Sequence, residues 1–342
     1  MAPTPKSKKL DASIIIVNFN GKSLLGACLK SLQTQSTSHT FEIIVVDNAS
    51  TDGSVDYLFA QFPDVIVVQE NQNSGFGRAN NLGASRATGE YLIFLNADTE
   101  VEPTWLFEML TVAQSNPKIA AVSPRVYLYA TKGNQKKVQN AGILVFKQGF
   151  ATDRGVFYRN GVSDYELDSK FYDQPTTLPA CCGVSLLVKT DAFTSIGGFD
   201  HDYFMYYEDV DLSLRLRQRG YLCEYAPKAI VWHHHGASSQ IASPFFIFHT
   251  ERSRILFVAK HFPLSTLLTT VFFYLGFISV AFARAVSMLL QSDFSQMNRW
   301  LEITRLRCSV LLQVVVKIPQ IIVRTRTKPT WIAAMNLYET FL

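Results

Sequence analysis

Three acidic side chains, Glu208, Asp209 and Asp211, lie close together in a stretch that reads IGGFDHDYFMYYEDVDLSLRLR over residues 196–217. Paired glycines and an aromatic cluster precede them, and the apolar spacing that follows predicts a helix ending at Gly220. Carboxylates at the first turn of a helix are often simple caps, which the helix dipole stabilises. A cap has no need of paired glycines and aromatic residues beside it. We therefore interpret this stretch as the wall of an active site that holds a general base.

Polar residues also follow short apolar runs earlier in the chain. These runs predict buried strands at residues 13–18, 41–46, 65–69 and 90–95. Helical spacing between them predicts an α/β sheet of parallel strands whose ligands gather at the carboxyl ends of the strands. Asp47 follows the second run, but alone it is an ordinary loop residue. Asn96 and Asp98 follow the last run, where Asp98 can hold a divalent cation against a diphosphate.

The run NQNSGFGRANN at residues 71–81 predicts a glycine-rich turn that opens a helix. Asn80 stands at the third glycine position of the dinucleotide-binding fingerprint, and the glycines come several residues after the preceding strand. Both departures argue against a dehydrogenase. A turn of this kind at the start of a helix still suits a diphosphate or sugar hydroxyls.

Three consecutive histidines, His233, His234 and His235, follow a predicted strand. Consecutive side chains of an extended chain point to opposite sides, so all three cannot converge on one metal ion. We expect at most one metal ligand among them, with packing or surface roles for the others.

Charge and hydropathy change towards the C-terminus. Residues 251–342 hold 11 Lys and Arg against 4 Asp and Glu, whereas residues 1–250 hold 21 against 24. Residues 264–283 form an uncharged run of 20 residues, about the length that crosses a bilayer. A second apolar stretch, at residues 310–323, contains Lys317 and Pro319 and better suits a helix in the membrane interface.

A basic, apolar tail predicts an anionic membrane surface as a partner and argues against nucleic acid. The alternative is a helical hairpin that packs on the catalytic domain or on another subunit. The five cysteines lack CxxC spacing, which is typical of a reducing compartment. The N-terminus has lysines but no apolar core segment, so we expect no secretory signal.

Taken together, the motifs resemble glycosyltransferase family 2 with the GT-A fold, from residue 13 to about residue 263. The motifs are SIIIVNFN, EIIVVDNASTDGS, NSGFGRANNLG, FLNAD, ACCGVSLLVKTDAF, IGGFDHDYFMYYEDVDLSLR and VWHH. They most resemble the rhamnosyltransferase-like branch that builds bacterial surface polysaccharides. The resemblance implies an α/β GT-A fold with a mostly parallel central sheet, and the apolar, basic sequence after residue 263 adds an expected helical, membrane-associated C-terminal tail.

The same resemblance implies a division of the chain. Residues 1–12 are expected to form a basic extension and residues 13–263 the catalytic domain, with a donor half to about residue 125 and an acceptor half from about residue 126. Residues 264–342 are expected to form the helical tail.

The resemblance also implies roles for single residues. Donor and nucleotide contacts are expected from Phe19, Asn20, Asp47, Arg78 and Asn96. Mg²⁺ or Mn²⁺ is expected on Asp98 and His233, and catalysis from Asp209 as base with Glu208 beside it. Asp211 and Tyr207 are expected on the acceptor side. Asn96 replaces the first acid of the family's DxD motif, which removes a charge beside the ion although its carbonyl oxygen can still ligate.

The implied activity is inverting transfer of a sugar, with rhamnose as one candidate, from a nucleotide-diphosphate donor to a saccharide or lipid-linked acceptor. The expected setting is surface polysaccharide synthesis at the cytoplasmic face of the cell membrane, with a peripheral attachment, a single helix or a helical hairpin. A homo-oligomer is left open.

Two alternative functions remain. A sugar nucleotidyltransferase needs a glycine-rich, basic N-terminal loop, and residues 13–22 hold one glycine and one lysine. A catalytically inactive membrane-bound scaffold has no need to keep Asp98, Asp209 and His233 together. The sequence does not identify the sugar, the acceptor or the linkage.

Overall fold

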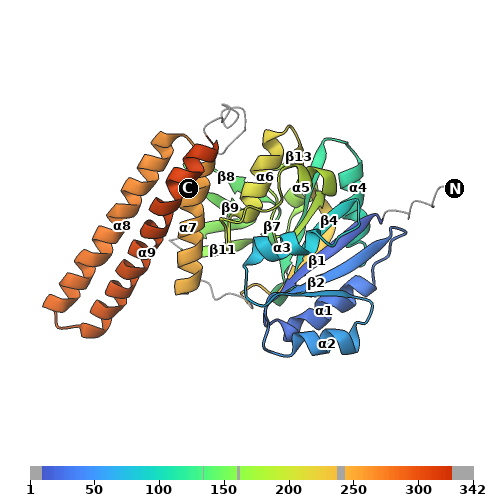
Figure 1. The fold of residues 1–342 in the computed structure, drawn as a ribbon, viewed down its shortest axis with the longest axis horizontal. Helices are drawn as coiled ribbons and strands as arrows, with labels where there is room; N and C mark the ends of the chain where they lie inside the picture. The colour runs from blue at the N-terminus through green and yellow to red at the C-terminus, as the bar shows by residue number, and fades with distance from the viewer. Residues whose placement is uncertain (1–9, 134, 160–161, 237–242, 326–342) are drawn as a thin grey trace. The chain divides into compact units, whose positions relative to one another are not determined.

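The computed structural model describes residues 10–133, 135–159, 162–236 and 243–325 (Figure 1). Most of the expected N-terminal extension and residues 326–342 of the tail lie outside these ranges. The chain forms two compact units. The first contains the chain up to Leu144, Thr152–Phe204 and the segment from Glu208 to residue 236; the second contains Val145–Ala151, Met205–Tyr207 and residues 243–325. The boundary expected at residue 263, between the catalytic domain and the helical tail, stays a prediction.

Four parallel strands form the centre of the first unit, in the order β4, β1, β2, β3. They are β1 (Ala12–Asn18), β2 (Phe41–Asp47), β3 (Ile66–Gln69) and β4 (Tyr91–Asn96). The connecting helices are α1 (Lys22–Gln33), α2 (Ser54–Gln61) and α3 (Phe76–Ala84). Because the strands are parallel, the polar residues at their carboxyl ends share one edge of the sheet. Asn18, for example, pairs with Asp47.

The sheet continues beyond β4 with strands of both directions, and within the described residues it has 11 strands. The added strands are β5 (Thr99–Val101), β6 (Ile119–Leu128), β7 (Lys137–Asn140), β10 (Val156–Arg159), β11 (Val162–Leu167), β12 (Ser185–Lys189) and β13 (Leu222–His233). Strand β12 is antiparallel to β4 and β6, and β13 is parallel to β6 and antiparallel to β5. A separate two-stranded sheet consists of β8 (Ile143–Val145) and β9 (Ala151–Asp153).

The predicted elements agree with the structure in most places. The spacing of residues 22–33 predicts a helix with the observed bounds of α1, and residues 190–195 predict a short helix that is observed as α5 (Thr190–Ser195). A helix starting at Pro103 and running to about Ser115 is also predicted, and it is observed as α4 (Trp105–Gln114). The apolar runs at residues 221–225 and 229–231 predict two short strands, and this prediction is wrong. The structure has a single strand there, β13, with an irregularity between Ala226 and Ile230.

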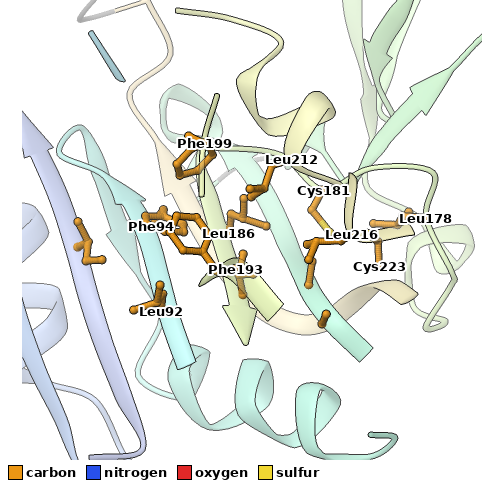
Figure 2. Close-up of a cluster of buried hydrophobic side chains, with 14 of the residues drawn as sticks. Leu92, Phe94, Leu178, Cys181, Leu186, Phe193, Phe199, Leu212, Leu216 and Cys223 are labelled. Atoms are coloured by element: carbon orange, nitrogen blue, oxygen red, sulfur yellow. The ribbon is translucent and has the colours of Figure 1, made fainter. Parts of the chain in front are cut away.

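An aromatic cluster fixes helix α6 (Glu208–Gln218) to the sheet (Figure 2). Phe199 packs edge-on against Phe94 of β4, with ring centroids 4.8 Å apart, and against Phe193 of α5 at 5.6 Å. Leu212 and Leu216 bring the buried face of α6 into the same core. Each such aromatic pair contributes about 0.5–1.5 kcal/mol beyond the burial of its area. The first turn of α6, with its acids, is thereby held in a defined position.

The second unit is built mainly from three helices that pack against one another, α7 (Pro244–His261), α8 (Leu264–Leu290) and α9 (Phe294–Thr325) (Figure 1). Ser243 caps α7 by accepting a hydrogen bond from the N–H of Phe246. A polar contact also joins two of these helices. The hydroxyl of Tyr274 in α8 donates a hydrogen bond of 2.7 Å to Glu251 of α7. The apolar stretch at residues 310–323 is part of the continuous helix α9, which contains Pro319.

Candidate active site

Asp47 lies at the carboxyl end of β2 and is 2% exposed. Its Oδ2 accepts a hydrogen bond of 3.0 Å from Asn18 Nδ2, and its Oδ1 accepts one of 2.9 Å from the N–H of Ser50. The pairing of Asn18 with Asp47 in the parallel register brings these groups together. Asp47 therefore orders the turn that leaves β2, and its contact with a nucleotide stays a prediction.

Phe19 and Asn20 lie on the same edge of the sheet, directly after β1. Phe19 is 49% exposed, which leaves its ring accessible to a stacking partner. Asn20 has a left-handed backbone with φ of 53°, and its Oδ1 accepts a hydrogen bond of 2.7 Å from the N–H of Thr51. Asn20 is thus joined to the turn that Asp47 orders, and Phe19 directly precedes it in the chain.

The glycine-rich turn before α3 is tied to the same edge. Asn48 donates through Nδ2 to Asn73 Oδ1 at 2.9 Å and accepts from the N–H of Ser74 at 2.9 Å. Gly75 has φ of 84°, and a Cβ there would lie 2.4 Å from the carbonyl oxygen of Phe204, so only glycine fits. Arg78, one turn into α3, is exposed. Its side chain is therefore accessible, and its contact with the nucleotide stays a prediction.

Asp98 and His233 meet because β5 pairs with the end of β13. The register places His233 opposite Thr99, and the N–H of His234 donates to the carbonyl oxygen of Asp98 at 2.9 Å. Asp98 Oδ1 then lies 3.1 Å from His233 Nε2, and both residues are more than nine-tenths buried. The structure therefore brings the two predicted metal ligands together, although they are far apart in the sequence.

The contacts of His233 test whether this pair fits a metal ion. Its Nδ1 lies 2.8 Å from Oε1 of the buried Gln139, a contact in which Nδ1–H donates to the carbonyl oxygen. Nε2, which faces the Asp98 carboxylate, is then the ring nitrogen that can bind a cation. A cation between these two atoms satisfies both, and a hydrogen bond from the other ring nitrogen, here to Gln139, is the usual support of a metal-binding histidine. The donor set fits a divalent cation.

Protein ligands alone do not complete such a site. Among the residues that the structure describes, no group of three or more His, Cys, Asp and Glu side chains is placed to hold a metal ion. Asn96, at the end of β4, is partly buried and makes no side-chain hydrogen bond within the described part of the chain. Mg²⁺ in particular is commonly held by one or two carboxylates together with substrate phosphates and water.

The other two histidines behave as expected from strand alternation. The ring of His235 lies on the same side as His233, with ring centroids 5.7 Å apart. The ring of His234 instead stacks on Tyr129 at 3.6 Å, and its Nε2 lies 3.5 Å from Glu100. The prediction that the three histidines do not converge is confirmed.

Asp209 lies in the first turn of α6 and is partly exposed. Its Oδ2 accepts a hydrogen bond of 2.8 Å from the N–H of Gly183, and its Oδ1 accepts one of 2.8 Å from the N–H of Val210. Burial raises the pKa of Asp209 above the ordinary value, while these N–H groups lower it and leave a net rise. The result is an oriented carboxylate that binds a proton more readily than an ordinary aspartate.

The flanking acids differ from each other. Glu208 is 6% exposed, and its Oε2 has no hydrogen-bond partner among the described residues. Burial and the neighbouring Asp209 carboxylate raise the pKa of Glu208 well above its ordinary value. Asp211 is fully buried and accepts a hydrogen bond of 2.7 Å from Arg215 Nε, the i,i+4 pair that the sequence predicts. The acceptor role of Asp211 stays a prediction.

Tyr207 belongs to the second unit, although it directly precedes Glu208 in the chain. Tyr206 and Tyr207 both have left-handed backbones, with φ of 66° and 67°. Their rings pack on Phe246 and Phe257 of α7, with centroids 5.1 and 5.3 Å apart. Strain of this kind costs about 1–3 kcal/mol per residue and is concentrated at functional sites. The expected acceptor contact of Tyr207 stays a prediction.

Three groups near these residues were not predicted from the sequence. Gln139 accepts a hydrogen bond from His233, and the N–H of Gly183 donates one to Asp209. The third is the carboxyl group of Asp153. Asp153 lies near enough to both Asp209 and His233 for their charges to affect its pKa. Burial and the Asp209 carboxylate raise this pKa to about 7. Gln139 and Asp153 lie outside the motifs, and no local pattern singles them out. Gly183 lies within the motif ACCGVSLLVKTDAF, but the motif does not show which carboxylate its N–H binds.

Comparisons with known proteins extend this picture. A family model described as "Glycosyl transferase family 2" matches residues 13–185. The chain is 30% identical over 238 residues to the O-antigen biosynthesis protein RfbC of Myxococcus xanthus, covering 69% of this chain and 18% of that protein. It is 28% identical over 238 residues to the N-acetylglucosaminyl-diphospho-decaprenol L-rhamnosyltransferase of Mycobacterium tuberculosis (strain ATCC 25618 / H37Rv), covering 66% and 76%.

Solved structures are similar to this chain at the level of the fold. GalNAc-T7, solved with UDP, GalNAc and Mn²⁺, aligns with a TM-score of 0.56 at 18% identity, over 75% of this chain and 49% of that one. The mannosyltransferase PcManGT of Pyrobaculum calidifontis, solved with GDP-Man and Mn²⁺, aligns with a TM-score of 0.51 at 16% identity, over 91% and 88%. The chain therefore has the GT-A fold, with the mostly parallel central sheet that was predicted.

Proposed function

The chain belongs to glycosyltransferase family 2, and we propose that it transfers a sugar, with inversion, from a nucleotide-diphosphate donor to a hydroxyl group of a saccharide or lipid-linked acceptor. The similarity to a rhamnosyltransferase whose name specifies a diphospho-decaprenol acceptor supports L-rhamnose and a lipid-linked saccharide as the first candidates. The similarity to an O-antigen biosynthesis protein supports a role in surface polysaccharide synthesis.

The observation that carries this proposal is the placement of Asp209. Two N–H groups orient its carboxylate at the start of α6, and desolvation makes it a better proton acceptor than a surface aspartate. In the proposed reaction Asp209 takes the proton of the acceptor hydroxyl as that oxygen attacks the anomeric carbon. General-base catalysis of this kind contributes about 10²- to 10⁴-fold to the rate. Attack from the face opposite the leaving diphosphate inverts the anomeric centre.

Asp98 and His233 are proposed to hold a divalent cation, Mg²⁺ or Mn²⁺, with Asn96 beside them. The bound cation would neutralise the negative charge of the diphosphate leaving group. Gln139 keeps the ring of His233 in the tautomer that presents Nε2. The Mn²⁺ in the two GT-A structures supports this assignment.

The nucleotide is proposed to lie along the carboxyl edge of β1 and β2. Phe19 offers an exposed ring for stacking, and the Asp47 turn offers polar groups to the base. Asn20 and Arg78 complete this donor side, Arg78 through its exposed guanidinium. The hydrogen bonds among these loops pre-order the edge, which reduces the entropy lost on binding.

The second unit is proposed to hold the enzyme at the cytoplasmic face of the membrane. Of the described helices, α8 is the one that is long and apolar enough to cross a bilayer by length and composition. It buries only Leu267, Thr270, Tyr274, Ala281 and Ala285, and large apolar side chains make up most of its exposed residues, with Arg284 as its one charged residue. A lipid-linked acceptor stays in the bilayer, so an enzyme held at its surface meets that substrate at high local concentration.

A donor screen tests the proposed function directly. Purified chain is incubated with nucleotide sugars, among them dTDP-L-rhamnose, UDP-GlcNAc and GDP-mannose, and release of the nucleoside diphosphate is measured with Mn²⁺ or with EDTA. We expect release from one donor, loss of that release in EDTA, and its loss in Asp98→Ala. Undiminished release in EDTA contradicts the metal assignment, and release from no donor contradicts the proposed activity.

A further inference from the structure

Charged side chains of the neighbouring helices lie beside the middle of the uncharged run in α8. The run covers residues 264–283, and Tyr274 stands at its centre. The Tyr274 hydroxyl donates a hydrogen bond of 2.7 Å to Oε2 of Glu251 in α7. The other oxygen of this carboxylate lies 3.5 Å from Nη2 of Arg307 in α9. Helix α8 is therefore joined, at the centre of its apolar run, to an acid and a base on the two helices that pack against it.

Two contacts show how α9 runs along α8. The Arg307 guanidinium lies 5.4 Å from the ring centroid of Phe277, and its Nη1 donates to the carbonyl oxygen of Phe277 at 3.4 Å. The Arg284 guanidinium lies 4.7 Å from the ring of Trp300. The step between the two contacts is seven residues on each helix (284 − 277 and 307 − 300) and has opposite directions, so the helices form an antiparallel hairpin (Figure 1). The first half of α9 therefore lies beside the second half of α8.

This half of α9 is charged on its exposed side, at Arg299, Glu302 and Arg305. If α8 crossed a bilayer with Tyr274 at the midplane, Arg305 and Glu302 would lie about 8 and 12 Å from that plane, since a helix rises about 1.5 Å per residue. The hydrocarbon core extends about 15 Å to either side, so both charges would lie inside it. One charged side chain near the bilayer centre disfavours insertion by about 100-fold. Because α9 packs on α8, crossing by α8 would carry these charges into the bilayer.

The exposed side of α8 is apolar along the whole helix. Its exposed large side chains include Leu268, Phe272, Phe273, Phe282 and Leu289. A helix of this kind gains most when these side chains lie among acyl chains and the cations beside it stay at the headgroups. Arginine side chains reach the headgroup layer readily, because their long stems are apolar and their guanidinium groups remain hydrated. The hairpin therefore suits a position in the membrane interface.

We infer that the α8–α9 hairpin enters one leaflet of an anionic bilayer and does not cross it. The turn at residues 291–293, which joins the two helices, then stays on the side of the membrane from which the hairpin enters. Arg299 and Arg305 contact anionic headgroups, and the exposed side of α8 lies among acyl chains. This inference rests on the membrane role proposed above for the second unit and specifies how that unit binds.

The turn between the helices distinguishes a one-leaflet hairpin from a crossing helix. Gln291→Cys places a thiol at the exposed end of α8, in a Cys308→Ser background, because Cys308 is exposed and the other four cysteines are buried. Gln61→Cys, at the exposed end of α2 in the first unit, is the matched control in the same background. Both full-length variants are expressed in bacteria. A membrane-impermeant maleimide is then added to intact spheroplasts and, separately, to permeabilised ones.

We expect both variants to pellet with the membranes and to react with the maleimide only after permeabilisation. Reaction of Gln291→Cys in intact spheroplasts, while Gln61→Cys stays unlabelled, shows that α8 crosses the membrane and overturns the inference. Recovery of Gln291→Cys in the soluble fraction also overturns it, because no lipid surface is then bound. Neither reading depends on sugar transfer, so a failure of the proposed activity is detected separately by the donor screen.

Removal of the two arginines gives opposite results for the two positions of the hairpin. At the headgroups each arginine strengthens binding about fivefold, so Arg299→Gln combined with Arg305→Gln should weaken binding to phosphatidylglycerol vesicles by about 10- to 30-fold. Lys30→Gln combined with Arg86→Gln removes two exposed cations of the first unit and should leave binding within about twofold of wild type. Inside a bilayer the arginines would oppose insertion, so unchanged or tighter binding by the Arg299 and Arg305 variant contradicts the inference. The thermal midpoint of each variant confirms that it is folded.

Discussion

Asp209 shows how one carboxylate can be both oriented and reactive. The two N–H groups on its oxygens fix its position, and they also stabilise its ionised form. Desolvation raises the pKa of Asp209 by more than these N–H groups lower it, so this pKa lies above that of an ordinary aspartate. Because the side chain is still partly exposed, a substrate can reach it. A general base needs this combination of accessibility and proton affinity.

A pH profile follows from this pKa. Only the ionised carboxylate can accept a proton, so kcat/KM for transfer should be full above the pKa of Asp209 and fall as the pH drops through it. Because that pKa is raised, we expect the acid limb at a higher pH than the ordinary aspartate value of 3.8. The thermal midpoint, measured over the same range, serves as the control that the protein stays folded. An acid limb near 3.8 would contradict the raised pKa.

At the scale of elements, α6 matters because it carries the acids into the site. Its buried face packs on the aromatic cluster, and its first turn is held by the Asp211–Arg215 ion pair. Arg215 also donates to the carbonyl oxygen of Ile196 at 2.9 Å, which ties the helix to the glycine-containing loop before it. The helix is therefore fixed at both its core face and its start.

Replacement of Asp211 tests this support. Asp211→Asn leaves the mostly buried guanidinium of Arg215 without its counter-charge, and breaking a buried pair in this way costs about 3–5 kcal/mol. We expect the free energy of unfolding, measured by urea denaturation, to fall by that amount. Asp64→Asn is the exposed control and should stay within about 0.5 kcal/mol of wild type. A stable Asp211→Asn protein with lost acceptor binding would instead favour the acceptor role predicted for Asp211.

Elements with a clear period could be predicted from the sequence, and irregular ones could not. The apolar spacing of α1 and the β-branched run of β1 give their bounds to within a residue. Strand β13 was divided in two because Pro227 interrupts its pattern, and proline is tolerated in strands mainly at irregularities such as the one after Ala226. The three-residue strand β5 is too short to show a period.

The residues of the candidate site also divide into those that a sequence pattern could predict and those that it could not. Asp98, Asp209 and His233 stand in motifs that the resemblance singles out, and the structure pairs Asp98 with His233. Gln139 and Asp153 lie in short strands whose partners are far along the chain. Their roles depend on strand pairing, which a sequence pattern of a few residues does not determine.

At the scale of the whole molecule, the chain joins a catalytic unit to a helical unit with a large exposed apolar surface. Phe272 and Phe273 of α8 are 72% and 61% exposed. Residues 251–342 carry an excess of Lys and Arg, and each such residue near an anionic surface contributes about 1 kcal/mol. Apolar area and positive charge together suit a membrane that contains anionic lipid.

Vesicle binding tests this surface. In full-length protein, Phe272→Ser combined with Phe273→Ser should weaken binding to phosphatidylglycerol vesicles by at least about tenfold, because burial of each ring contributes about 1.5–3 kcal/mol. The matched control is Phe59→Ser combined with Phe171→Ser, since these rings are 59% and 65% exposed in the first unit. The control should bind as wild type does. Wild-type vesicle binding by the α8 variant, with a smaller mass in solution, would instead indicate a subunit interface.

The central claim is that Asp209 acts as the base of a sugar transfer. Glu208→Gln is the natural comparison, because Glu208 adjoins Asp209 and is also a carboxylate with a raised pKa. If Glu208 only orients the site, its loss should reduce turnover less than the loss of Asp209. Donor affinity, measured by calorimetry with the donor from the screen, shows whether each variant still forms the nucleotide site.

The most direct measurement is turnover of sugar transfer by Asp209→Asn in the full chain. The asparagine keeps the size of the side chain but cannot accept the proton. We predict that turnover falls by about 10²- to 10⁴-fold while the dissociation constant of the donor stays within about twofold of wild type. Turnover equal to that of the wild type, with the donor still bound, would contradict the account.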